Sequence, residues 1–204
     1  MRRLVIVLLL IAALGAAIGV ARWVTPHFGA SGAPSWYAKA VYPLDHTEAI
    51  RSSARDNSLD PALVAAVIYA ESRFDEHARS EQGAVGLMQI LPETAEQIAR
   101  ETGGIAFTTA DLEDPEVNVR YGCYYLRSAL DAFDDDLRAA VASYNAGMGA
   151  VMEWRAAAAA NGHPLRIADI PYAETRAYVR AVLTARRVYR ETYGERLRVS
   201  SESG

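Results

Sequence analysis

The stretch that decides the fold reads Asp60-Pro61-Ala62-Leu63-Val64-Ala65-Ala66-Val67-Ile68-Tyr69-Ala70-Glu71-Ser72. An aspartate side chain can cap a helix N-terminus, and proline is favoured at the first helical position. Almost every residue that follows is apolar, up to Glu71. This pattern predicts a strongly apolar helix that begins at Pro61 and ends at about Ser72.

Further helix signals along the chain indicate a mainly α domain. Asp114-Pro115 repeats the start signal, and apolar residues follow it on one helix face. No long alternating pattern predicts a strand, although residues 80–91 could form a small irregular β element. The other predicted helices run from Pro92 to Glu101, from Leu137 to Tyr144 and from Tyr172 to Tyr193.

The N-terminal residues have the composition of an export signal. Arg2 and Arg3 precede an unbroken apolar run from Leu4 to Ala21. This run is longer than the ~7–15 residues of a cleaved signal core and approaches the ~17–25 residues of a membrane-spanning helix. Residues 1–24 are therefore interpreted as a signal anchor or a signal peptide, with the anchor slightly preferred. Either form would place the domain in the extracytoplasmic cell envelope.

The rest of the chain is expected to form one domain. Residues 25–35 contain prolines and glycines typical of a linker, residues 36–194 are expected to be the domain, and residues 195–204 are a polar tail. Without residues 1–21 the chain has 19 basic and 25 acidic side chains, because Arg2 and Arg3 are removed from the 21 basic ones. The resulting charge of −6 argues against a nucleic-acid partner.

Composition predicts neither a metal nor another cofactor. The four histidines are scattered without metal-ligand spacing, and Cys123 has no second cysteine to pair with. Cys123 is interpreted as a small buried hydrophobic residue. Residues 134–136 are three aspartates, but they lack the spacing of a calcium loop and are better explained as a helix start. A monomer is the default expectation.

The segment Ala70-Glu71-Ser72-Arg73-Phe74 contains a candidate catalytic acid. Val67 and Ile68 share the helix face of Glu71, so its carboxylate should lose hydration, which favours the neutral form. The negative end of the helix acts in the same direction. A carboxyl group that stays protonated near neutral pH can donate a proton to a glycosidic oxygen. The alternative is a glutamate that simply leaves the helix into solvent.

The segment from Ser80 to Gln89 combines two glycines with a short apolar stretch. Glycine allows the backbone to approach a ligand or a packed neighbour closely. Gln89 offers an amide that can bind a sugar acetamido or hydroxyl group. The alternative is a tight loop with Met88 in the core.

Four motifs occur in order across about residues 45–190. They are Glu71-Ser72-x-Phe74, Gly86-Leu87-Met88-Gln89, Tyr144-Asn145-Ala146-Gly147 and Glu174-Thr175-Arg176-x-Tyr178-Val179. This series resembles the soluble lytic transglycosylase family, which is related to goose-type lysozyme. One departure is Ser143, where that family often has alanine. The chain also lacks the large helical superstructure of some relatives.

The resemblance implies a lysozyme-like, mainly helical fold with a cleft for a peptidoglycan glycan strand. It implies that Glu71 is the single catalytic carboxylate. The substrate-binding residues that it implies are Ser80 and Gln89 near the scissile bond, Met88 as an apolar wall, Tyr144 near Glu71 or the sugar, Asn145 in the cleft floor, and Tyr178 reaching back from the final helix. Outside these positions, Trp154 is interpreted as a core residue rather than a sugar-stacking one, and Glu174 and Arg176 as braces of the last helix.

The resemblance also implies a reaction. The β-1,4 bond between N-acetylmuramic acid and N-acetylglucosamine would be cleaved without water, leaving 1,6-anhydromuramyl ends. One alternative is a hydrolytic muramidase of the lysozyme type, and another is a non-catalytic peptidoglycan-binding module. An intact glutamate in its motif speaks against the second alternative.

Overall fold

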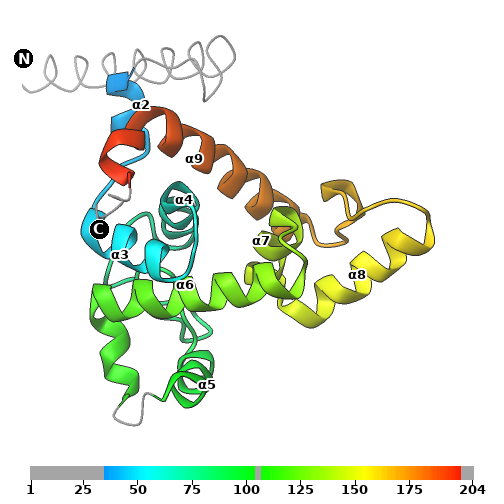
Figure 1. The fold of residues 1–204 in the computed structure, drawn as a ribbon, viewed down its shortest axis with the longest axis horizontal. Helices are drawn as coiled ribbons and strands as arrows, with labels where there is room; N and C mark the ends of the chain where they lie inside the picture. Colours follow the sequence, from blue (N-terminus) through cyan, green and yellow to red (C-terminus); the bar gives the residue numbers. More distant parts are fainter. Residues whose placement is uncertain (1–34, 104–106, 199–204) are drawn as a thin grey trace, which may run out of the picture.

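A computed structural model describes residues 35–103 and 107–198, and nearly all regular structure in these ranges is helical (Figure 1). The mainly α fold predicted from the sequence is therefore confirmed. The α-helices are α2 (Ser35–Val41), α3 (Thr47–Asp56), α4 (Pro61–Ser72), α5 (Pro92–Thr102), α6 (Pro115–Ala132), α7 (Leu137–Ala146), α8 (Met148–Ala160) and α9 (Ala173–Leu197), with the 3₁₀ helices η1 (Thr109–Glu113) and η2 (Ile167–Asp169).

The aspartates that indicated helix starts in the sequence cap those helices in the structure. The Asp60 carboxylate accepts a hydrogen bond from the backbone N–H of Ala62 at 3.0 Å, and Asp114 caps α6 in the same way. Asp136 accepts hydrogen bonds from the first N–H groups of α7, which confirms the helix-start interpretation of the aspartate cluster. Gly103 ends α5 with a φ of +77°, a conformation that glycine adopts without strain.

Helix α4 lies at the centre of the core. All residues from Ala62 to Tyr69 are buried, as expected for a helix that is apolar on every side. It packs chiefly along α9, where the Tyr69 and Tyr189 rings meet with centroids 6.2 Å apart. Helix α6 crosses below this pair and contacts α3 and α7 (Figure 1). This arrangement brings the C-terminal end of α4, which carries Glu71, close to the N-terminal part of α9.

The segment after α4 contains the irregular β element that the sequence predicted. Two isolated antiparallel bridges join Arg79 to Val85 and Val85 to Ile90. Cys123, on α6, is completely buried, as predicted. Helix α9 continues past its predicted end at Tyr193 because Leu197 is also buried against the core.

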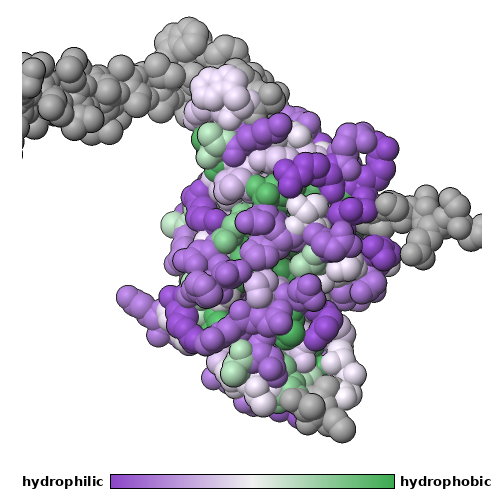
Figure 2. All heavy atoms as spheres, turned by 90° about the vertical axis from the view of Figure 1, so that its left-hand side faces the viewer, coloured by the Kyte–Doolittle hydropathy of each residue, from purple (hydrophilic) through white to green (hydrophobic). Residues whose placement is uncertain are grey.

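The predicted N-terminal anchor or signal, most of the linker and the end of the tail lie outside the described residues. In residues 35–103 and 107–198, no helix combines the length and apolar character required to cross a bilayer. On the side where α2 and α3 lie, hydrophilic residues predominate and hydrophobic ones are scattered between them (Figure 2).

Candidate active site

Glu71 occupies the last turn of α4, where the helix reaches the surface. Its side chain is half-buried, and this burial raises the pKa of the carboxyl group to about 7. The hydroxyl of Tyr178 donates a hydrogen bond to Oε1 of Glu71 at 2.5 Å, which partly opposes the rise in pKa. The raised carboxyl pKa expected from the sequence is therefore found in this fold, with desolvation as its main cause.

Two tyrosines from different helices flank this carboxyl group. Tyr178 comes from α9, and Tyr144, from the end of α7, donates its hydroxyl proton to the backbone carbonyl of Met88 at 3.0 Å. Burial, with the negative charge of Glu71 as a second cause, raises the pKa of both phenols well above its ordinary value. Both hydroxyls consequently remain protonated and act as hydrogen-bond donors at neutral pH.

The loop Gly86-Leu87-Met88-Gln89 is fixed from behind by a residue that sequence reasoning missed. Asn118 of α6 is fully buried; its Oδ1 accepts from Met88 N–H at 2.8 Å, and its Nδ2 donates to the carbonyls of Val85 and Leu112. Gly86 has a φ of +76°, and a Cβ added there would lie 2.4 Å from Nδ2 of Asn118. Asn118 thus sets the path of the loop, and its only sequence signal is an amide among apolar helix residues.

A second missed residue joins the loop to α4, the helix that carries Glu71. Ser72, directly after Glu71, is buried, and its hydroxyl lies 2.8 Å from the Leu87 carbonyl and 3.2 Å from the Ile68 carbonyl. A hydroxyl group has a single proton, so one of these two carbonyls receives it at any moment. The serine of the Glu-Ser motif therefore holds the end of α4 against the loop.

The other predicted site residues have partners within the protein. The Gln89 amide N–H₂ donates to the carbonyls of Ala78 and Gly86, at 3.1 and 2.9 Å, and Ser80 Oγ accepts from Ala84 N–H at 3.0 Å. Both side chains thus shape the segment after α4. In the described residues, no hydrogen bond joins either of them to Glu71.

Met88 differs from its predicted place. It is 0% exposed, and its side chain lies so close to Gly122 of α6 that a Cβ there would come within 2.3 Å of the sulfur. The expectation that Met88 forms an apolar wall of the cleft is therefore wrong. Its side chain packs in the core instead, in the space that the missing side chain of Gly122 leaves free. Only the Met88 backbone carbonyl takes part in the site, as the acceptor for Tyr144.

Asn145 is exposed beside Tyr144, and its Oδ1 accepts a hydrogen bond from Thr175 Oγ1 at 2.7 Å. Thr175 is buried in the first turn of α9. This bond ties the end of α7, which carries Tyr144, to the start of α9, which carries Tyr178.

Two overlapping cavities lie elsewhere, between α3 and α6. They have volumes of about 410 and 570 Å³ and share Asp56, Asn57 and Tyr124 among their lining residues. None of the predicted site residues lines either cavity. They are therefore separate from the site around Glu71.

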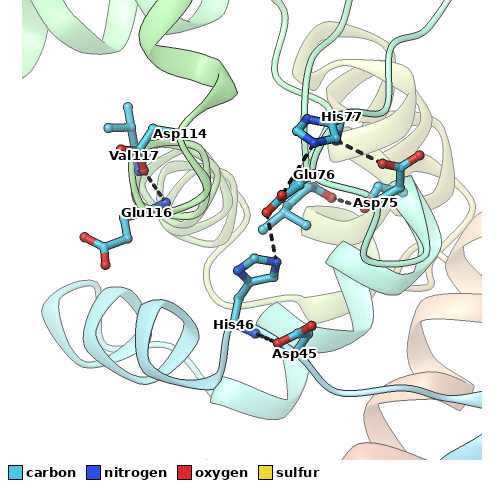
Figure 3. A network of polar contacts seen from close by, with 10 residues as sticks. Asp45, His46, Asp75, Glu76, His77, Asp114, Glu116 and Val117 are labelled. Atoms are coloured by element: carbon cyan, nitrogen blue, oxygen red, sulfur yellow. Dashed lines mark hydrogen bonds and ion pairs between the residues drawn. The ribbon is translucent and has the colours of Figure 1, made fainter.

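A polar network follows the catalytic segment on the outer surface. Nε2 of His46 and Nε2 of His77 each lie 3.5 Å from the Glu76 carboxylate, which links the start of α3 to the loop after α4 (Figure 3). Within the described part of the chain, no three histidine, cysteine, aspartate or glutamate side chains are arranged to hold a metal ion.

A carboxyl group with a raised pKa, hydrogen-bonded to one phenol and close to a second, makes Glu71 the candidate general acid–base residue of this helical domain. The family described as Transglycosylase SLT domain matches residues 48–165, and this chain belongs to that family. Tyr178 lies beyond the matched range. The resemblance inferred from the four motifs is thereby confirmed.

Similar proteins agree with this assignment. The soluble lytic murein transglycosylase of Salmonella typhimurium is 30% identical over 169 residues, which cover 79% of this chain and 25% of that protein. Among solved structures, the 70-kDa soluble lytic transglycosylase of Escherichia coli has a TM-score of 0.70 at 25% identity, covering 90% of this chain and 31% of the other. An inactive mutant of the lytic transglycosylase Slt from Pseudomonas aeruginosa has a TM-score of 0.68 at 32% identity, covering 75% and 25%. The chain thus spans about a quarter of the length of the curated relatives that it matches.

Proposed function

We propose that this protein is a peptidoglycan lytic transglycosylase. It cleaves the β-1,4 bond between N-acetylmuramic acid and N-acetylglucosamine and leaves 1,6-anhydromuramyl ends. The observation that carries the proposal is the Glu71 carboxyl group, whose pKa near 7 leaves it partly protonated at neutral pH. The names of its relatives, which are lytic transglycosylases about three times as long, support the same reaction.

In the proposed reaction Glu71 acts twice. Its protonated form donates to the glycosidic oxygen, and the muramyl 2-acetamido group stabilises the positive charge that develops at C1, as in substrate-assisted glycosidases. The ionised carboxylate then removes the proton of the muramyl 6-hydroxyl, whose oxygen bonds to C1 and closes the anhydro ring. Glu71 regains its proton, and no water is consumed.

The neighbouring residues have supporting roles in this proposal. Tyr178 stabilises the ionised form of Glu71 through its donated hydrogen bond. Tyr144 is held beside the acid by the Met88 carbonyl, and its oxygen can accept a hydrogen bond from a sugar hydroxyl. Gln89 keeps its amide oxygen for the sugar, while Ser80 and Asn145 line the same side of the substrate. No cofactor is required by these steps.

The product ends test the proposed reaction. Digestion of purified peptidoglycan sacculi should release fragments that mass spectrometry identifies as 1,6-anhydromuramyl products. Each is one water lighter than the reducing-end product of hydrolysis. Reducing ends alone would identify a hydrolytic muramidase, and absence of any soluble fragment would indicate a non-catalytic binding module.

The N-terminal apolar run places the domain at the outer face of the membrane in this proposal. Residues 1–24 would anchor it, residues 25–35 would link it to the catalytic domain of residues 36–194, and the chain would act as a monomer. Fractionation of cells that express the native chain should recover it with membranes and with its N-terminus intact. A soluble form that begins near Arg22 would show that the run is a cleaved signal instead.

A further inference from the structure

We propose that Tyr172 is the platform of an additional glycan-binding subsite beside the catalytic centre. This inference rests on the proposed function, because it assigns a further contact to the same glycan strand. Tyr172 directly precedes α9 and is 58% exposed, although it is a large aromatic residue. Exposed aromatic rings of this kind are suited to an amphipathic ligand. The apolar C–H face of a pyranose sugar is such a ligand.

The backbone that carries Tyr172 is held in place. The guanidinium of Arg176 donates to the carbonyls of Ile170 and Pro171, at 2.6 and 2.9 Å. Ile170 is buried in the core, and Pro171 restricts the backbone directly before the ring. These contacts confirm the predicted bracing role of Arg176, and they mean that an exposed ring stands on a fixed segment.

The ring itself is supported from one side by α8. Trp154 is half-buried and packs against the core, in agreement with its interpretation as a core residue. Its ring contacts the Tyr172 ring edge to face, with the ring centroids 5.3 Å apart. In Figure 1, α8 and the segment returning from it extend to one side of the body beyond α7. Trp154 therefore limits the orientations of Tyr172 and reduces the entropy that a ligand must overcome on binding.

The position of Tyr172 connects it to the catalytic residues. Tyr172 and Thr175 are three residues apart at the start of α9, and Thr175 binds Asn145, the exposed neighbour of Tyr144. Six residues separate Tyr172 from Tyr178, a distance of about 9 Å along the helix axis at 1.5 Å per residue. The platform is thus near enough to contact a sugar of the same strand that has its scissile bond at Glu71.

This arrangement predicts a dependence on chain length. Tyr172→Ala should raise KM for long peptidoglycan glycan strands roughly 3- to 10-fold, the range expected for loss of one aromatic contact, while kcat stays close to that of the unaltered protein. Tyr172→Phe, which keeps the ring, should retain the original KM. KM for a tetrasaccharide too short to reach the platform should be the same in all three proteins.

A matched control uses a second strongly exposed aromatic residue of the described part of the chain. Trp36 is 66% exposed on α2, so Trp36→Ala should leave KM for long strands unchanged. Equilibrium binding of long strands to the Glu71→Gln protein, with and without Tyr172→Ala, gives a second measurement that needs no turnover. Equal affinities there, or an equal rise in KM for short and long substrates, would overturn the subsite. Failure of the unaltered protein to cleave any glycan would instead overturn the proposed function.

Discussion

Glu71→Gln is expected to reduce glycan cleavage by at least ~10²–10⁴-fold, the range typical for loss of a general acid–base catalyst. Glutamine has nearly the same shape and can still accept the Tyr178 hydrogen bond, but it neither donates a proton to the glycosidic oxygen nor removes one from the 6-hydroxyl. The rate of soluble fragment release from sacculi measures this loss. The circular dichroism spectrum of Glu71→Gln should match that of the unaltered protein, which would show that the fold is unchanged.

A matched substitution and the pH profile make this expectation specific. Glu153, an exposed glutamate on α8, should tolerate Glu153→Gln without loss of activity. Because the acid form of Glu71 is lost as pH rises through its pKa, kcat/KM of the unaltered protein should fall with a midpoint near pH 7. In Tyr178→Phe that midpoint should move to higher pH, since the hydrogen bond that favours the carboxylate is gone. The assignment would be excluded if kcat/KM already fell at the acidic pH where an ordinary glutamate titrates, or if Glu71→Gln kept full activity.

Asn118→Ala is expected to lower the free energy of unfolding by ~3–5 kcal/mol, because three buried backbone groups each lose a hydrogen bond at once. These groups are the N–H of Met88 and the carbonyls of Val85 and Leu112. Urea denaturation measures the change. Under conditions where the variant is still folded, its activity should also fall, because the Met88 carbonyl that holds Tyr144 is no longer fixed.

The comparison for this variant is an exposed asparagine with a single partner. The side-chain amide of Asn161, directly after α8, donates one hydrogen bond, to the Ala157 carbonyl. Asn161→Ala should therefore change the free energy of unfolding by less than about 1 kcal/mol. If both variants lost the same small amount of stability, Asn118 would not be the residue that fixes the loop.

Local signals predicted much of this fold. Asp60-Pro61 and Asp114-Pro115 mark helix starts because each aspartate caps backbone N–H groups only two or three residues further on. Such short-range contacts can be recognised in the sequence. The short helices α2 and α3 were not predicted. Helix α3 has no side-chain cap and begins after His46, which adopts a left-handed conformation. Local reasoning is weakest where no cap or periodicity marks the start.

The sequence indicated the candidate acid but not the residues that support it. Glu71 could be inferred from its apolar helix, and Tyr178 from the resemblance, yet the bonds of Asn118 and Ser72 join segments 15 or more residues apart. Met88 was placed wrongly for the same reason, since its position depends on the space at Gly122. Contacts between distant segments depend on tertiary packing, and the residue pattern of a single segment does not predict them.

The hydrogen bond between Tyr178 and Glu71 joins residues 107 positions apart, one on α4 and the other on the last helix, α9. During synthesis, a chain whose last helix has not yet formed therefore lacks the phenol that contacts the Glu71 carboxyl group. Under the proposed function, a nascent polypeptide of this design would therefore reach full activity only after its final helix had packed against α4.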